Sequence, residues 1–512
     1  MLIPLFGTGT QGQAEVLSAQ RRVNCYVELP KDPEKSQVTV LSMPGMTQIY
    51  DLDDYVTYIP SSSGVLAGPI RAMANITAAS ANNSAYVAVV RGGWVWQLAL
   101  VGGLAGTRAG EYVSGSGFMT GGDEDYATEP RVDICDVSGG MMITTGNGVG
   151  SMALPGQGFS LGGNHFYQAA IQAATTPEDP SSCVQLGNRI VVSIPSQKYF
   201  RYSEDIVWPV SWDALDFTTP ESYPDTTIRV WANRGSLIAF GESSTEFFGL
   251  SGDPDAPYAP IRGASQPVGL AAKWSVASVA GDVVFLGKGP NGSHQVYRIS
   301  GYSVSVVSDQ QIDDVFNAFD TITDATALSY SVGGHTFYQI NFPTEDKSYA
   351  LDITTGVWSQ MVGPDGGRHP AEFAVTWRNK TLIAHHTDPV IYELDTDVHT
   401  FSGDEMPREI VTRHFFKDFD RVIVDELTID FDVGLGSEAG SDPQVMLQIS
   451  KDNGKSWGTE LWQSLGKIGE TRKRVVWRRL GQGRDWTFKL RVTDDVDFVI
   501  AGAALIATPV VG

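Results

Sequence analysis

The most specific local pattern in the sequence is Ser450-Lys-Asp-Asn-Gly-Lys-Ser-Trp457, which has the Ser-x-Asp-x-Gly-x-Ser/Thr-Trp spacing of an Asp box. In a hairpin turn of this kind, Gly454 can take a positive φ, and the side chains of Ser450 and Asp452 can hydrogen-bond backbone amides. Trp457 can then pack beneath the turn. Glycosidases that use this motif carry several copies in a propeller, whereas this chain holds one copy near its C-terminus. We therefore interpret the motif as a structural turn.

Paired carboxylates are the other residues that could perform chemistry. They occur at Asp51-Leu-Asp-Asp54, Asp123-Glu-Asp125 and Asp313-Asp314. Such pairs serve glycoside hydrolysis or calcium binding in other proteins. None of them has the Asp-x-Asn/Asp-x-Asn/Asp-Gly pattern of an EF-hand. Because acidic clusters arise by chance in so acidic a chain, we interpret them as solvated or lumen-facing charge.

Histidine and cysteine spacing predicts no metal site and no catalytic nucleophile. His385 and His386 are adjacent, so on a strand their rings are expected on opposite faces. Cys25, Cys135 and Cys183 lie far apart without a CxxC spacing, which indicates buried free thiols in a reducing compartment. No Gly-x-Ser-x-Gly elbow and no phosphate-binding glycine loop stands between a predicted strand and a predicted helix. We expect no catalytic residue, no cofactor and no metal.

One basic stretch, Arg472-Lys-Arg-Val-Val-Trp-Arg-Arg479, interrupts the acidic sequence, and Arg484, Lys489 and Arg491 follow it. It is either a solvated strand face or a docking surface for an acidic patch on a neighbouring subunit or for a phosphate. The sequence leaves both interpretations open. The candidate docking residues are Arg472, Lys473, Arg474, Arg478 and Arg479.

The overall charge limits the possible partners. The 512 residues include 59 Asp and Glu against 36 Lys and Arg, for a formal net charge of −23. Broad nucleic-acid binding depends on Lys and Arg that release counterions from phosphates, so this chain is not expected to grip DNA. A wall past which DNA must slide is compatible with the charge. No apolar run approaches the roughly 20 residues that span a bilayer, and the N-terminus is a poor signal peptide.

Short apolar runs after small turns indicate strands through most of the chain. About seven such runs recur at intervals of roughly 45 to 53 residues, among them Gly187–Val192, Gly281–Leu286 and Gly333–Tyr338. This period predicts a β-propeller of six or seven blades, each a four-stranded sheet that packs against its neighbours. Hairpins of an unrelated all-β fold are the alternative. One helix is expected within Asp309–Phe319, from apolar residues at three-to-four spacing.

A different pattern begins after a polar segment between residues 397 and 407. Leu427–Val433 alternates apolar and polar residues, and the segments around Leu447 and Leu490 do the same. Such alternation gives each strand one buried and one solvated face, which predicts a C-terminal antiparallel β-sandwich. The expected domains are an extended N-terminal arm at 1–60, a propeller at 61–400 and the sandwich at 401–512.

Several passages, colinear from about residue 23 to residue 492, together resemble the packaged-DNA stabilisation proteins, or tail accessory factors, of short-tailed bacteriophages. They are Val23-Asn24, Pro44-Gly-Met-Thr47, Arg201-Tyr-Ser203, Trp212-Asp-Ala-Leu-Asp-Phe217, Pro224-Asp225, Phe240–Gly252, Gly263-Ala264 with Gly269, Phe285-Leu-Gly287, Gly301-Tyr302, Lys473–Trp477 with Gly481, and Phe488–Val492.

This resemblance implies a tail hub or nozzle rather than an enzyme. Members of the family form a ring, usually sixfold, below the portal and its adaptor. The ring extends the channel for double-stranded DNA, retains the packaged genome and anchors fibres, spikes or a needle. The implied location is the virion tail, with assembly in the host cytoplasm. We expect a net acidic lumen and basic C-terminal strands that face a protein neighbour.

Two other functions stay open from the sequence. The first is a tail-associated propeller glycosidase, a polysaccharide depolymerase, which needs two carboxylates about 5 to 10 Å apart in a groove. The second is a carbohydrate-binding propeller with exposed aromatic residues on its blades. The tryptophans are scattered rather than repeated at one position per blade, which disfavours the second.

Overall fold

The computed structural model describes residues 20–29, 38–53, 68–77, 86–91, 94–99, 112–117, 131–137, 140–144, 151–153, 166–168, 180–206, 212–213, 215–223, 225–416, 420–434 and 441–510. These residues form strands and one helix, α1 (Gln310–Asn317). At eight residues, the helix found within these ranges is too short to cross a bilayer.

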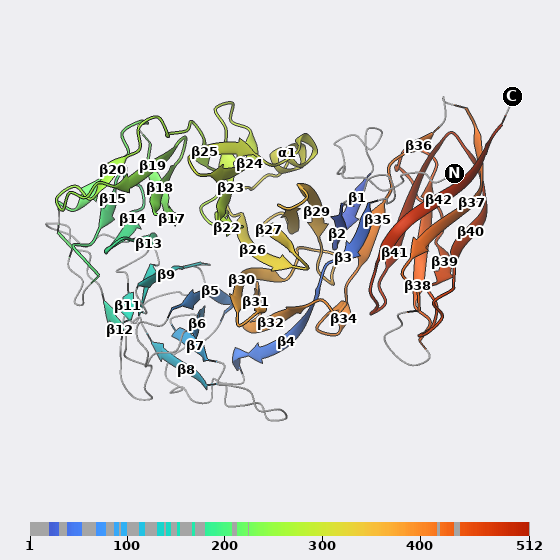
Figure 1. Cartoon of the computed structure of the whole chain (residues 1–512), viewed down its shortest axis with the longest axis horizontal. Helices are drawn as coiled ribbons and strands as arrows, with labels where there is room; N and C mark the ends of the chain where they lie inside the picture. Colours follow the sequence, from blue (N-terminus) through green and yellow to red (C-terminus); the bar gives the residue numbers. More distant parts are fainter. Residues whose placement is uncertain are drawn as a thin grey trace.

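Seven sheets stand around a common axis in the described part of the chain (Figure 1), and we number them as blades 1 to 7. Blades 1 to 4 each have four strands in chain order. Blade 1 has β5 (Ile70–Ile76), β6 (Tyr86–Arg91), β7 (Trp94–Ala99) and β8 (Tyr112–Gly117), and blade 2 has β9 (Asp133–Val137), β10 (Gly140–Thr144), β11 (Ser151–Ala153) and β12 (Phe166–Gln168). Blade 3 has β13 (Ser182–Leu186), β14 (Arg189–Ser193), β15 (Phe200–Tyr202) and β16 (Phe217–Thr218), and blade 4 has β17 (Thr227–Asn233), β18 (Ser236–Gly241), β19 (Thr245–Leu250) and β20 (Tyr258–Pro260).

Blades 5 to 7 complete the ring. Blade 5 has β21 (Gly269–Leu270), β22 (Ala277–Val279), β23 (Asp282–Lys288), β24 (His294–Ser300) and β25 (Ser303–Val306). Blade 6 has β26 (Thr326–Val332), β27 (His335–Phe342), β28 (Lys347–Asp352) and β29 (Val357–Met361). Blade 7 has β30 (Ala371–Trp377), β31 (Lys380–His385), β32 (Val390–Asp395) and β4 (Gly45–Asp51), to which β33 (Thr400–Phe401) and β34 (Asp404–Glu405) are added. The first strand of blade 7 lies against the first strand of blade 1.

The burial of the strands follows from this packing. A middle strand such as β23 is buried on both faces, because each sheet lies between two others, whereas the outermost strand β25 is largely exposed. The hairpins that open several blades turn in two residues. Arg234 and Gly235 have φ of 49° and 80°, which matches the positive-φ turn that suits the twist of a hairpin.

The expected helix forms beside blade 5. Asp309 caps its N-terminus by accepting a hydrogen bond from the Ile312 amide at 2.8 Å. Ile312 and Phe316 are buried, and Val315 and Phe319 pack against the same core. The apolar residues at three-to-four spacing therefore mark the buried face of the helix.

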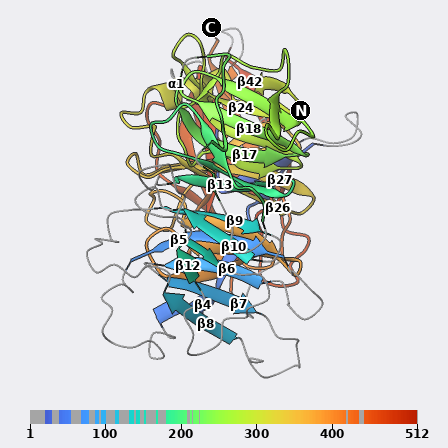
Figure 2. The same cartoon turned by 90° about the vertical axis from the view of Figure 1, so that its left-hand side faces the viewer.

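The C-terminal part is a sandwich of two sheets. One sheet has the order β1 (Arg21–Val23), β35 (Arg408–Val411), β41 (Asp485–Val492), β38 (Gln444–Ser450) and β39 (Leu461–Ser464), with β36 (Phe415–Phe416) paired to β41; the other has the order β2 (Cys25–Glu28), β3 (Thr39–Ser42), β42 (Ile500–Pro509), β37 (Val422–Phe431) and β40 (Val475–Gly483). Leu427, Leu447 and Leu490 are all buried in the core between them, as the alternation predicts. Figure 2 views the propeller from the side opposite the sandwich.

The described N-terminal residues contribute strands to both parts. β4 pairs with β32 and completes blade 7, while β2 and β3 belong to the sandwich. β1 runs parallel to β29 of blade 6 and antiparallel to β35, which makes one 10-stranded sheet from blade 6 to the sandwich. The division at residues 60 and 400 stays a prediction.

Candidate functional site

A cavity of about 250 Å³ lies at the centre of the propeller. Six of the seven blades contribute residues at or near their first strands to its wall. They are Ala72–Ala74, Arg131–Ile134, Arg229, Trp231, Trp274, Val276–Ser278, Ala327–Ser329, Phe373 and Ala374. Most of these residues are apolar, and two arginines, from blades 2 and 4, are the cations among the described residues of this wall.

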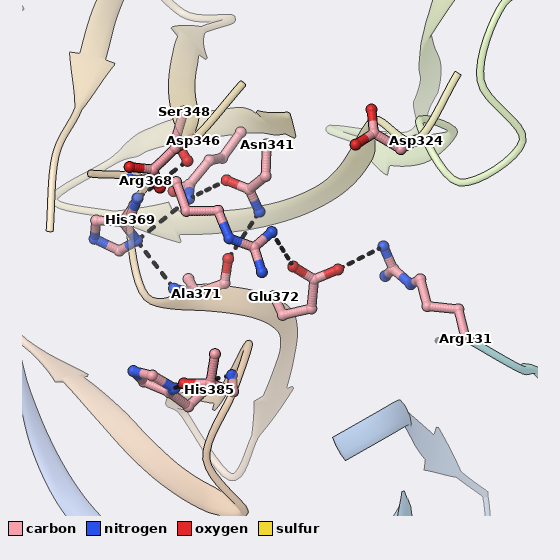
Figure 3. Close-up of polar contacts among 12 residues, drawn as sticks. Arg131, Asp324, Asn341, Asp346, Ser348, Arg368, His369, Ala371, Glu372 and His385 are labelled. Atoms are coloured by element: carbon pink, nitrogen blue, oxygen red, sulfur yellow. Dashed lines mark hydrogen bonds and ion pairs between the residues drawn. The ribbon is translucent and has the colours of Figure 1, made fainter. Parts of the chain in front are cut away.

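Arg131, at the start of blade 2, reaches across the axis to blade 7. Its Nη1 lies 3.2 Å from Oε1 of Glu372, and the other carboxylate oxygen of Glu372 lies 3.3 Å from Nη1 of Arg368 (Figure 3). Burial lowers the pKa of Arg131 to about 10, although the Glu372 charge acts in the opposite direction. Its guanidinium carbon stands 4.1 Å from the centroid of the Phe373 ring. One carboxylate thus joins two arginines between blades that are not neighbours.

Arg229 makes a second connection between blades that are not adjacent. Its Nη2 lies 3.0 Å from Oδ1 of Asp133 in blade 2, and its Nη1 donates to the Lys273 carbonyl oxygen at 2.9 Å. The other oxygen of Asp133 accepts a hydrogen bond from the Cys183 amide of blade 3 at 3.2 Å. The Trp274 ring has the guanidinium carbons of Arg131 and Arg229 at 5.6 and 4.9 Å from its centroid. These contacts cross-link the blades around a shared indole ring.

A buried polar cluster lies between blades 6 and 7, beside Arg368 (Figure 3). His369 donates its amide to Ser348 Oγ at 3.1 Å, and its Nδ1 accepts from the Ala371 amide at 3.2 Å. Asn341 donates to the Ala371 carbonyl oxygen at 2.8 Å. Burial, with a smaller effect of His385, lowers the pKa of His369 to about 3, so the ring is neutral. The polar groups of these residues thus form hydrogen bonds with one another.

The adjacent histidines are arranged differently from the prediction. The rings of His385 and His386 contact each other, with centroids 4.8 Å apart, instead of pointing to opposite faces of a strand. The prediction was wrong because β31 ends at His385, so the period-two rule no longer applies to His386. Across the ranges that the structure describes, no three His, Cys, Asp or Glu side chains gather as metal ligands.

The predicted Asp box forms the turn after β38. Gly454 has a φ of 85°, and its amide donates to Ser450 Oγ at 2.9 Å. Asp452 Oδ1 accepts from the Ser450 hydroxyl at 2.7 Å and from the Ser456 amide at 2.9 Å. These hydrogen bonds, that of the Ser456 hydroxyl first, lower the pKa of Asp452 to about 2. Trp457 is half-buried. A function beyond the turn stays a prediction.

Trp457 also borders a cleft on the sandwich. Lys489 Nζ stands 4.6 Å from the centroid of its ring, and Leu461 and Leu480 line the same cleft. The ammonium group of Lys489 therefore partly covers one face of the Trp457 ring.

The basic stretch lies on and before β40, at the edge of its sheet. Arg472, Arg474 and Arg479 are exposed, and Lys473 lies within 4 Å of Glu470 and Asp442. Arg478 Nε lies 2.9 Å from Glu426 Oε2, with 69% of the arginine side chain exposed. The structure brings these five residues to one exposed edge, and their docking role stays a prediction.

Three residues of the acidic clusters, Asp51, Asp53 and Asp313, make local contacts. Asp53 pairs with Arg91 at 2.7 Å, and its amide donates to Asp51 Oδ1 at 3.0 Å. Asp313 accepts a hydrogen bond from Gln295 at 2.5 Å. Asp54 and residues 123–125 lie outside the described residues.

Sequence reasoning missed the residues at the axis, because Arg131, Arg229 and Glu372 are far apart in the chain. A weak signal exists. At or near the first strands of several blades, a charged residue stands one or two positions before an aromatic one, as in Arg229-Val-Trp231, Lys273-Trp274 and Glu372-Phe373. Read across the repeats, this signal places charge and aromatic rings together at the axis.

Comparison with known proteins places the chain in a class of bacteriophage proteins that combine a β-propeller with a β-sandwich. A family model described as "Bacteriophage P22 Gp10, beta-propeller" matches residues 182–399, and one described as "Bacteriophage P22 Gp10, beta-sandwich" matches residues 407–507. Together they match more than half of the chain, which belongs to the P22 Gp10 family. The predicted family and fold class are confirmed.

The particular relative is the tail hub protein gp10 of Salmonella phage P22. It is 22% identical over 296 residues, which cover 56% of this chain and 61% of the relative. The match therefore spans less than two thirds of the relative's length.

Solved structures resemble the chain only weakly. BamB from Moraxella catarrhalis matches with a TM-score of 0.34 and 12% identity over 69% of this chain and 97% of BamB. The computationally designed Ika8 protein matches with a TM-score of 0.34 and 9% identity over 64% of this chain and 96% of the design.

Proposed function

We propose that this chain is a structural component of a phage tail, a hub or nozzle subunit. In this proposal it forms a ring, usually sixfold in the family, below the portal and adaptor. The ring extends the DNA channel, retains the packaged genome and anchors fibres, spikes or a needle. The protein is assembled in the host cytoplasm and located in the virion tail. The observation that carries the proposal is the pair of family matches, propeller then sandwich, in one chain.

The geometry of the axis bears on where DNA passes. The central cavity measures about 250 Å³, and the Arg131–Glu372 and Arg229–Asp133 pairs connect blades across the axis. Duplex DNA cannot enter a space of this size. We infer that the DNA channel lies between copies of the chain and not within one propeller.

The net charge is compatible with a channel that does not bind DNA tightly. A chain with a net charge of −23 repels phosphates on average, so DNA held by a plug slides freely once released. The exposed basic edge around Arg474 and Arg478 is the exception. We propose that this edge docks on an acidic neighbour in the tail, either another copy or the adaptor.

The test of docking is Arg474→Ala combined with Arg478→Ala. We expect purified rings of this variant to attach more weakly to portal–adaptor particles, measured by co-sedimentation. Arg234→Ala is the matched control, because Arg234 is also exposed and pairs with a carboxylate, Asp282, but lies in the propeller. Normal attachment of the double variant, or equal loss in the control, contradicts the docking role.

The test of the hub role is the position of the protein in the particle. Electron microscopy of assembled virions is expected to show a symmetric ring at the genome exit. Incubation with host envelope polysaccharide, followed by an assay for new reducing ends, tests the glycosidase alternative. A solitary subunit that releases reducing ends would overturn the proposal.

A further inference from the structure

The cavity at the propeller axis presents two buried cations to the same space. The side chains of Arg131 and Arg229 are 9% and 6% exposed, and both line the cavity. The Nε atom of each has no hydrogen-bond partner among the described residues, although each guanidinium is ion-paired through another nitrogen. A buried N–H donor without a partner is costly, so each site is incomplete as the protein alone provides it.

The two guanidinium groups also lie near the same indole ring. Both face the Trp274 ring, with carbons 5.6 and 4.9 Å from its centroid, and Lys273 Nζ lies 4.5 Å from the same centroid. The charge of Arg229 opposes ionisation of Arg131. Glu372 shares its charge between Arg131 and Arg368. Among the described residues that line the cavity, Arg131 and Arg229 are positive and Asp133 is negative, and Glu372 pairs with Arg131 from beside the cavity.

The shape of these groups selects the kind of ligand. A guanidinium presents a planar fork of N–H donors that fits the oxygens of phosphate or carboxylate. Because the Arg131 guanidinium carbon lies 4.1 Å from the centre of the Phe373 ring, that ring limits its movement. A volume of about 250 Å³ holds several waters of about 30 Å³ each, or one small oxyanion with water.

We propose that this cavity binds a small oxyanion, such as inorganic phosphate, between the guanidinium groups of Arg131 and Arg229. The anion accepts hydrogen bonds from both arginines and supplies the acceptor that their Nε–H groups lack among the described residues. It thereby connects blades 2 and 4 at the axis, where a structural anion stiffens the propeller. This inference is independent of the proposed tail function.

Phosphate binding to the full chain is the first test. Equilibrium dialysis with labelled inorganic phosphate, at constant ionic strength set with NaCl, is expected to show saturable binding of one phosphate per chain. Sulfate is expected to compete and chloride is not. Absence of saturable binding to the folded wild-type chain overturns the proposal. Thermal melts in increasing phosphate give a second readout. A melting temperature that rises linearly without saturation also overturns the proposal, because exclusion of phosphate from the protein surface explains such a rise.

Variants then locate the site. Arg131→Gln and Arg229→Gln are each expected to weaken phosphate binding at least tenfold. Arg189→Gln is the matched control: Arg189 also pairs with an aspartate, Asp216, and stacks on a ring, Tyr202, but lies outside the cavity. Circular dichroism checks folding, and Arg131→Lys, which keeps the charge without the fork, is expected to bind with intermediate affinity. Equal binding by the two axial variants and the control overturns the proposal.

Discussion

Replacing Asn24 by alanine is expected to weaken the joint between the propeller and the sandwich. Asn24 is fully buried, immediately after β1. Its side chain donates to the carbonyl oxygens of Val362 and Pro407 at 2.8 and 2.9 Å and accepts from the Val362 amide at 2.9 Å. One side chain therefore satisfies backbone groups at the end of blade 6 and at the start of the sandwich.

The expected cost follows from these contacts. Three buried groups lose their partners, at roughly 1 kcal/mol each after partial access of water. Asn24 also has a φ of 50°, where alanine costs about 1 kcal/mol more. The sum is about 4 kcal/mol. In a cooperative unit of 150 to 250 residues, each kcal/mol lowers the melting temperature by about 2 to 4 °C, so we expect a decrease of roughly 8 to 16 °C.

Differential scanning calorimetry measures this change. Asn317→Ala is the matched control, because Asn317 also makes three hydrogen bonds, to His294 and Asp313, but is exposed. We expect it to cost at most about 1 kcal/mol, since water replaces the lost partners. Asn24→Gly removes the same hydrogen bonds without the strain at positive φ, so it should be slightly less damaging than alanine. If Asn24→Ala melts no lower than Asn317→Ala, the joint does not depend on this side chain.

Three further predictions concern single side chains. His369 is neutral in the folded state with a pKa of about 3, whereas the unfolded value is near 6.5, so its contribution to stability is complete above pH 6.5 and falls as the pH decreases towards 3. We expect His369→Gln to flatten the acid dependence of the free energy of unfolding, measured by urea denaturation, by up to about 1.4 kcal/mol per pH unit, and an unchanged slope would contradict the neutral buried ring. Asp452→Ala should destabilise the sandwich by only about 1 kcal/mol in thermal melts, because the Asp452 side chain is exposed, and a loss above about 3 kcal/mol would contradict that. Burial raises the pKa of Cys25 to about 12, so iodoacetamide at pH 8 should alkylate it at least about 100-fold more slowly in the folded chain than in urea, and similar rates by mass spectrometry would contradict its burial.

The sequence predicts strand patterns well where one physical rule dominates. The alternation around Leu427 and Leu490 identifies the buried face of the sandwich, because each strand has one dry and one wet side. The spacing of Ile312 and Phe316 identifies the helix. The recurring turn-plus-strand runs indicate the propeller, because each blade opens with a hairpin.

The pairing between distant segments is not accessible in the same way. β1 and β4 are short, and nothing in Val23-Asn24 specifies the partners Gln360 and Glu409 that β1 meets. The contacts of the axial arginines are equally hard to predict from the sequence, because Arg131 and Glu372 are single charges separated by most of the propeller. Such contacts depend on the closure of the whole ring, which local composition does not encode.

The position of β1 constrains how the protein is made. Asn24 reaches its hydrogen-bond partner at Val362 across 338 residues of chain, and β1 lies between β29 and β35. During synthesis the N-terminal strand therefore waits, unpaired, until β29 and then β35 have emerged from the ribosome. A product truncated before residue 408 keeps an open sheet edge where β1 should meet β35. Incomplete chains thus present a defect that exposes them to proteases before they can join a particle.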